Sequence, residues 1–216
     1  MTYLAWAALF EGSSDLAYFA VLLPRLMNEI ISVDGTRPVI VPETPAIVFG
    51  RGGRTIEAVA AEACAARDAF HLLFIHADTG GRNHEETLPD RAGAYCRAIH
   101  RACGWKQERC VLVCPRHETE AWAIADPEAV AGALGYRGPP TDLELPPDGD
   151  SAERLVDPKL VLETASARIR RQRGRGGTLL PAIAQLQSFG QLRRSRSFRS
   201  FEASLRRGLV DLGMIR

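Results

Sequence analysis

Residues 71–78, HLLFIHAD, decide the fold class. They form a nearly continuous apolar run that ends at an acid, and the polar residues 79–84 follow, which is typical of a central parallel strand and its loop. The apolar runs at 3–10 and 110–114 have the same form. Strands that alternate with helices predict right-handed crossovers and a mostly parallel α/β sheet with helices on both faces.

The same patterns predict the other elements of this sheet. Weaker strands are expected at 38–41 and 46–49, on either side of a Pro-rich turn. Helices are expected at 13–31, 55–67 and 86–103, and another should begin near Ala121.

A stretch rich in Pro, Gly and Asp at 138–150 divides the chain and predicts a loop or linker. Residues 1–137 are the expected α/β core, and 151–216 are expected to form a helical, basic extension packed on it. Residues 1–153 carry 13 Lys and Arg against 22 Asp and Glu, whereas 154–216 carry 14 against 4. This asymmetry fits a metal–carboxylate site beside a surface for a polyanion, and equally two halves that neutralise each other across an interface.

The five cysteines, none of them in a CxxC pair, predict reduced and mostly buried thiols. No run approaches the roughly 20 uninterrupted apolar residues of a membrane span. The first ten residues lack the basic start of a signal peptide. We therefore expect a cytoplasmic protein that does not associate with membranes.

Carboxylates follow three of the predicted strands. Glu11 follows the first run, Asp78 the run at 71–78, and Glu118 with Glu120 the run at 110–114. Ligands of open parallel sheets bind beyond the carboxyl ends of the strands, so these acids should converge at one edge. Carboxylate oxygens suit Mg²⁺ or Mn²⁺, ions that stabilise a phosphate under attack and activate water.

Several neighbouring residues have a functional and a structural interpretation. Asp15 either faces the same site or is an ordinary first-turn acid. His76 would belong to a zinc site only if other histidines converged there. Arg116 and His117 can contact phosphate or move a proton, or simply pack in a loop. Lys159 either supplies positive charge to a transition state or is solvated in the first turn of a helix.

The basic tail is a candidate nucleic-acid surface. Its arginines can follow a phosphate backbone, although such runs are also common on solvated helix faces. The candidate contacts are Arg168, Arg170, Arg171, Arg173, Arg175, Arg193, Arg194 and Arg196.

Four motifs together resemble a known family. They are residues 10–15 (FEGSSD), 75–78 (IHAD), 118–126 (ETEAWAIAD) and 157–159 (DPK). In these the chain is similar to bacterial Toprim-like proteins related to the RloB and OLD-type nucleases, which are often encoded beside AAA/ABC-type ATPases in phage-defence loci.

The resemblance implies a Toprim-like, Rossmann-like sheet with Glu11 as metal ligand or general acid/base. It also implies metal ligands at Asp78 and Glu118 or Glu120, and a catalytic lysine at Lys159. The chain departs from the family where a DxD motif would place its second acid, because that residue is Gly80. Glu85 is among the nearest acids downstream, so either such an acid enters the site, or fewer metal ions bind, or catalysis is weak.

These observations lead to a first hypothesis and a rival. The first is a Mg²⁺- or Mn²⁺-dependent nuclease, the effector of a defence system with an ATPase partner, acting on DNA or on RNA such as tRNA. The rival is a non-catalytic subunit that docks an ATPase or nucleic acid. A phosphohydrolase or primase-like transferase acting on nucleotides is a weaker third option. A homo-oligomer is compatible with either of the first two.

Overall fold

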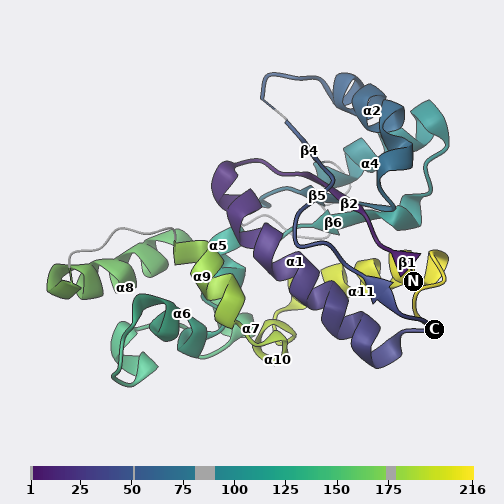
Figure 1. Cartoon of the computed structure of the whole chain (residues 1–216). Coiled ribbons are helices and arrows are strands. Elements are labelled where there is room, and N and C mark those ends of the chain that lie inside the picture. Colours follow the sequence, from purple (N-terminus) through teal and green to yellow (C-terminus); the bar gives the residue numbers. More distant parts are fainter. Residues whose placement is uncertain (1, 51, 81–90, 174–178) are drawn as a thin grey trace.

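A computed structural model describes residues 2–50, 52–80, 91–173 and 179–216, and for 170–173 it describes the backbone alone. Four parallel strands form the central sheet, in the order β4 (Ile47–Phe49), β2 (Trp6–Leu9), β5 (Leu72–His76) and β6 (Cys110–Val113). Helices flank the sheet on both sides (Figure 1). This confirms the predicted α/β class with a parallel, Rossmann-like sheet.

The apolar run at 3–10 was predicted as one strand and is two. β1 (Thr2–Tyr3) pairs with β3 (Val39–Ile40) in a separate small sheet, and β2 joins the central one. The chain changes partners at residues 4–5, where the Leu4 amide still donates to the Ile40 carbonyl at 2.9 Å. Three residues later, Ala7 pairs with β4 and β5.

Alternate side chains along the strands define two faces. We call the face with Trp6, Phe74 and Val111 the aromatic face; it is covered by α1 (Ser13–Asp34) and α11 (Arg196–Asp211). We call the face with Ala7 and Leu73 the cysteine face; it is covered by α2 (Ile56–Ala65) and α4 (Ala92–Cys103). Figure 1 shows α2 and α4 together on one side of the sheet and α1 on the other.

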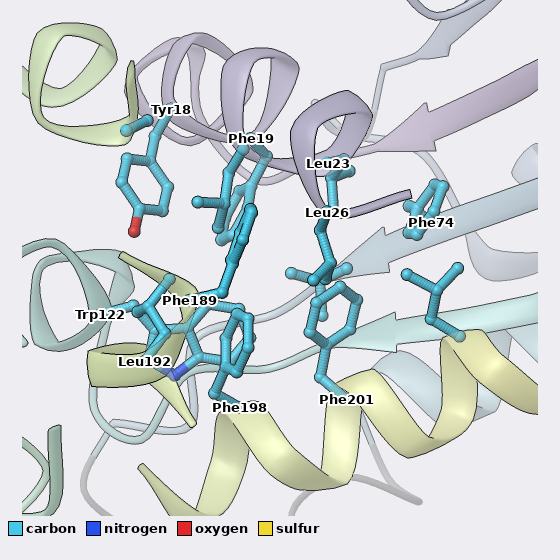
Figure 2. Packing of buried hydrophobic residues seen from close by; sticks show 14 of the residues in the cluster. Tyr18, Phe19, Leu23, Leu26, Phe74, Trp122, Phe189, Leu192, Phe198 and Phe201 are labelled. Carbon is cyan, nitrogen blue, oxygen red and sulfur yellow. The ribbon is translucent and has the colours of Figure 1, made fainter. Parts of the chain in front are cut away.

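The core on the aromatic face is built from rings that meet one another between α1 and α11 (Figure 2). The Trp122 ring lies 5.1 Å from Phe198, 5.4 Å from Phe201 and 5.9 Å from Phe19, measured between centroids. The indole N–H of Trp122 donates to the Ser197 hydroxyl at 2.7 Å, which satisfies the polar atom of this buried ring.

The cysteine face corrects the expectation of reduced thiols. Disulfides join Cys64 to Cys103 and Cys96 to Cys110, and the buried Cys114 lies outside both. The physical reason is that α2 and α4 pack against each other and α4 packs on β6, so cysteines remote in sequence meet on this face.

Helix α1 is long and apolar enough to cross a membrane by length and composition alone. In the structure it is a core helix, because Phe19, Leu22, Leu23 and Leu26 are fully buried on the aromatic face.

The second half of the described chain is helical. The predicted loop at 138–150 contains a 3₁₀ turn, η3 (Pro140–Leu143), and the start of α7 (Gly149–Ala152), because Asp148 caps that helix through the Ser151 amide. The predicted helix at 86–103 is described from Ala92 onward, since residues 81–90 lie outside the described part. The remaining elements are η1 (Arg67–Ala69), η2 (Gln107–Arg109), α5 (Thr119–Ala123), α6 (Pro127–Leu134), α8 (Pro158–Arg173), α9 (Leu179–Leu186) and α10 (Phe189–Leu192).

Candidate metal centre

Glu11 and Asp78 meet because their strands are neighbours. β2 and β5 pair in register, with Leu9 opposite Ile75, and each acid follows the end of its strand by two residues. The Asp78 amide faces the Glu11 carboxylate, with N and Oε2 3.5 Å apart. Glu11, Asp78 and His76 offer ligand atoms that all lie within 4.8 Å of one another.

His76 ends β5 and contributes an imidazole that is fully buried on the aromatic face. Its ring centroid lies 5.2 Å from that of Phe19 and 6.0 Å from that of Phe10. Its Nε2 lies 3.3 Å from Asp78 Oδ1, and its Nδ1 lies 3.8 Å from Asp15 Oδ2. From the sequence, His76 was considered for a zinc site with further histidines, whereas the structure puts it between the carboxylates of Asp15 and Asp78.

Asp15 caps α1 and also lies next to His76. The Gly12 amide donates to its Oδ2 at 2.9 Å, which stabilises the start of α1. The Thr119 hydroxyl donates to its Oδ1 at 2.6 Å. These two bonds fix the almost fully buried carboxylate beside His76.

Glu118 and Glu120 are not members of the metal-ligand group found among the described residues. Glu118 Oε1 instead accepts the Lys159 amide at 2.9 Å, at the start of α8. Burial raises the pKa of Glu120, and the nearby negative charges of Glu118 and Asp15 act in the same direction, while Lys159 opposes them. Glu120 is therefore close enough to interact electrostatically with Asp15, although it is not a member of the metal-ligand group.

A cavity of about 330 Å³ lies beside the centre, lined by Gly80, His117, Glu118, Val156, Asp157 and Lys159. His117 has a left-handed backbone (φ 67°), which its amide stabilises by donating to Thr79 Oγ1 at 2.9 Å. Burial and, to a lesser degree, Arg116 lower the pKa of the His117 imidazole.

Gly80 also has a left-handed backbone, with φ 61°. Residues with a side chain rarely adopt this conformation, so an acid is disfavoured there although no described residue would crowd its side chain. The local backbone thus gives a physical reason for the departure from a DxD motif.

The tail arginines whose side chains are described mostly contact acids or carbonyls of this chain. Arg193 binds Glu29 and Glu202, and Arg168 binds Glu144. Arg194 lies 3.4 Å from Asp148. The pairs with Glu29, Glu144 and Asp148 join the basic tail to residues 1–153, as the alternative in which the two halves neutralise each other predicts. Arg116 and Arg196 are exposed, while Glu85, Arg175 and the side chains of Arg170, Arg171 and Arg173 lie outside the described part.

Sequence reasoning missed two residues at this site. Thr119 sits between the two glutamates of the 118–120 segment, and only its position there hinted that it could reach Asp15. Arg91 donates to the Asp78 carbonyl oxygen at 2.6 Å. No signal in the sequence indicated that contact, which spans 13 residues.

The donor set consists of two carboxylates and one imidazole, which together suit a divalent cation. Lys159 lines the adjacent cavity and offers the charge that a phosphate group would require. Searches for similar proteins found no matching family model, no matching curated protein and no matching solved structure.

Proposed function

We propose that this chain is a divalent-metal-dependent nuclease whose centre is formed by Glu11, His76 and Asp78. The observation that carries the proposal is the convergence of these ligand atoms within 4.8 Å at the carboxyl ends of two adjacent parallel strands. A metal bound there would stabilise charge on a phosphate and activate water.

The cavity next to the centre supports a phosphate-containing substrate. Its Lys159 is exposed, and the Lys159 amide is held by Glu118, so α8 begins at the cavity rim. We propose that the Lys159 ammonium contacts a phosphate of the substrate. Arg116, exposed in the loop before α5, is a second candidate contact for the nucleic-acid backbone.

The resemblance in residues 10–15, 75–78, 118–126 and 157–159 extends the proposal to a Toprim-like effector in phage defence, working in the cytoplasm with an AAA/ABC-type ATPase. Under this proposal the substrate is DNA or RNA, including tRNA. The ATPase would hold the nuclease inactive or load it on its substrate.

A second candidate function is a non-catalytic subunit that docks an ATPase or nucleic acid. Gly80 favours it, because the left-handed backbone stands where a second acid would be needed for a second metal ion. Such a subunit would retain the shape of the site and perform no hydrolysis.

Cleavage of plasmid DNA and of total tRNA by the purified protein, with Mg²⁺, Mn²⁺ or EDTA, tests the first function. Asp78→Asn and Glu11→Gln should each lower the rate by at least about a hundredfold, since even groups outside the metal's ligand shell contribute 10–100-fold. The matched control is Glu57→Gln, which changes an exposed acid in the first turn of α2. If metal-dependent cleavage is unchanged in both Asp78→Asn and Glu11→Gln, these residues do not form the catalytic centre. No cleavage, even with the ATPase present, would favour the docking subunit.

A further inference from the structure

We propose that His76 is a direct nitrogen ligand of the metal, with Asp15 as its positioning residue, and that the centre therefore takes Mn²⁺ in preference to Mg²⁺. The inference deepens the proposed function and rests on its metal centre. It does not require nuclease activity, because it concerns which ion binds and through which atom.

The surroundings of His76 point to a ligand role. The imidazole is fully buried, yet its Nδ1 has no hydrogen-bond partner among the residues that the structure describes, and neither has the buried Oδ1 of Asp78. Buried polar atoms are nearly always satisfied, by protein, water or an ion. Two such atoms, two residues apart at one strand end, indicate missing partners. A metal ion held by Nε2 and the carboxylates would satisfy Asp78 Oδ1, and the neighbouring Asp15 carboxylate would accept the hydrogen of Nδ1.

Asp78 identifies the nitrogen that faces the metal, because its Oδ1 lies 3.3 Å from His76 Nε2. The Thr119 hydroxyl proton points to Asp15 Oδ1, so toward His76 Nε2, 3.2 Å away, the Thr119 oxygen can only accept. Without a metal, the Nε2 hydrogen can donate to Thr119. A metal at Nε2 replaces that hydrogen, and the ring then carries its hydrogen on Nδ1, directed at Asp15.

Asp15 then completes a carboxylate–histidine–metal arrangement. Histidines that bind metals commonly donate their other ring N–H to a carboxylate, which orients the ring and raises its basicity. Asp15 Oδ2 lies 3.8 Å from Nδ1, and its carboxylate is already held by Gly12 and Thr119. A small shift of the ring closes this separation to a hydrogen bond.

The donor types decide between the two ions. Mg²⁺ prefers oxygen donors and binds imidazole poorly, whereas the affinity of nitrogen-containing sites rises along the transition metals from Mn²⁺ onward. Gly80 removes the carboxylate that a second acid would offer, and His76 puts a nitrogen into the group. Two carboxylates with one imidazole suit Mn²⁺, which accepts both donor types.

Pulsed electron paramagnetic resonance of the Mn²⁺-loaded full chain measures the bond directly, because a bound imidazole gives ¹⁴N couplings to the ion. We expect these couplings in the unmodified protein and their loss in His76→Gln. The matched controls are His100→Gln, on α4, where the imidazole contacts the Trp105 carbonyl oxygen, and His117→Gln, in the adjacent cavity. Both should keep the couplings. Mn²⁺ bound without ¹⁴N coupling would overturn the proposal, and so would couplings retained in folded His76→Gln.

Calorimetric titration with Mn²⁺ and Mg²⁺ provides the second measurement. We expect Mn²⁺ to bind at least about tenfold more tightly than Mg²⁺. Asp15→Asn should weaken Mn²⁺ binding by about 10–100-fold while keeping the ¹⁴N couplings, as a positioning role predicts. Equal affinities for the two ions would overturn the proposed preference. If Mn²⁺ is bound through nitrogen but the protein cleaves nothing, this inference stands and the nuclease proposal fails. If Mg²⁺ supports cleavage and His76→Gln does not change the rate, the nuclease proposal stands and this inference fails.

Discussion

On the aromatic face, Trp6 meets Phe74 ring to edge and Trp122 contacts three further rings. On the cysteine face the helices contribute mainly Ala, the rings of Phe49, Phe70 and Trp105 form a smaller cluster, and two disulfides join the helices to each other and to β6. Large rings bury 150–250 Å² each, so they stabilise their face through area removed from water. Small side chains bury less apolar area, and the disulfides stabilise their face by restricting the conformations of the unfolded chain. The two faces of one sheet thus reach stability by different physical routes.

The largest effect that separates the two routes should come from Trp122→Ala. Removal of a fully buried indole should cost roughly 3–5 kcal/mol of unfolding free energy, because the rings of Phe19, Phe198 and Phe201 lose their common neighbour. On the cysteine face, Val59→Ala should cost about 1.6 kcal/mol, from the burial of two methyl-sized groups. Urea unfolding measures both, and equal losses would remove the distinction between the faces.

The second prediction removes the disulfides one at a time. Cys64 and Cys103 are 39 residues apart, and Cys96 and Cys110 are 14 apart. Loop entropy therefore predicts losses of about 4 and about 3 kcal/mol when each pair is changed to Ala, measured by urea unfolding. Denatured, unreduced protein should show one reactive thiol, from Cys114. A count of five would mean that the disulfides do not form.

A smaller effect should follow from Glu153→Gln, which tests the polar support of the aromatic face. The buried Glu153 carboxylate accepts the Ser195 hydroxyl at 2.5 Å and the amides of Arg196 and Ser197 at 2.9 Å each, at the start of α11. Hydrogen bonds to charged groups contribute about 1.5–3 kcal/mol, so we expect a loss near 2 kcal/mol in thermal unfolding. The exposed control Glu144→Gln should cost less than about 1 kcal/mol. Similar losses of stability in Glu153→Gln and Glu144→Gln would mean that the hydrogen bonds of Glu153 at the start of α11 do not stabilise the fold.

The smallest effect should be a gain, from Glu120→Gln at the rim of the aromatic face. Burial raises the pKa of Glu120, so its charged form is disfavoured in the folded state. Above the folded pKa the carboxylate destabilises the fold, and below the ordinary glutamate pKa both states bind the proton and the cost disappears. We expect Gln to raise Tm at neutral pH in EDTA, and to leave it nearly unchanged at acidic pH. A lower Tm at neutral pH would contradict the prediction.

The sheet could be predicted because its strands are short apolar runs with clear ends. β5 was expected at 71–77 and lies at Leu72–His76, and the end of β6 was likewise within a residue of its expected position. The split between β1 and β2 could not be predicted, because pairing with β3 depends on tertiary contact. The disulfides were missed for a similar reason: spacing along the chain does not show that α2 and α4 pack together.

Some features of the site could likewise be predicted from the sequence, and others could not. Glu11 and Asp78 were predicted to meet because adjacent parallel strands end at one edge. Glu118 was predicted there too, but capping of α8 takes its carboxylate to the Lys159 amide. The central position of His76 depends on which face the last residue of β5 points to, and the alternation of the strand could have indicated it. Its contact with Asp15 requires the angle at which α1 leaves β2.

The order of the segments along the chain has a consequence for how the protein is made. β6 ends at Val113, but α11, which covers the aromatic face, spans Arg196–Asp211. At about 5–20 residues per second, a ribosome needs roughly 4–16 s to synthesise the intervening segment. During that time the aromatic face lacks one of the two helices that cover it, and Phe74 lacks its contact with the Phe201 ring. The aromatic face is therefore completed late in synthesis, only once α11 has left the exit tunnel.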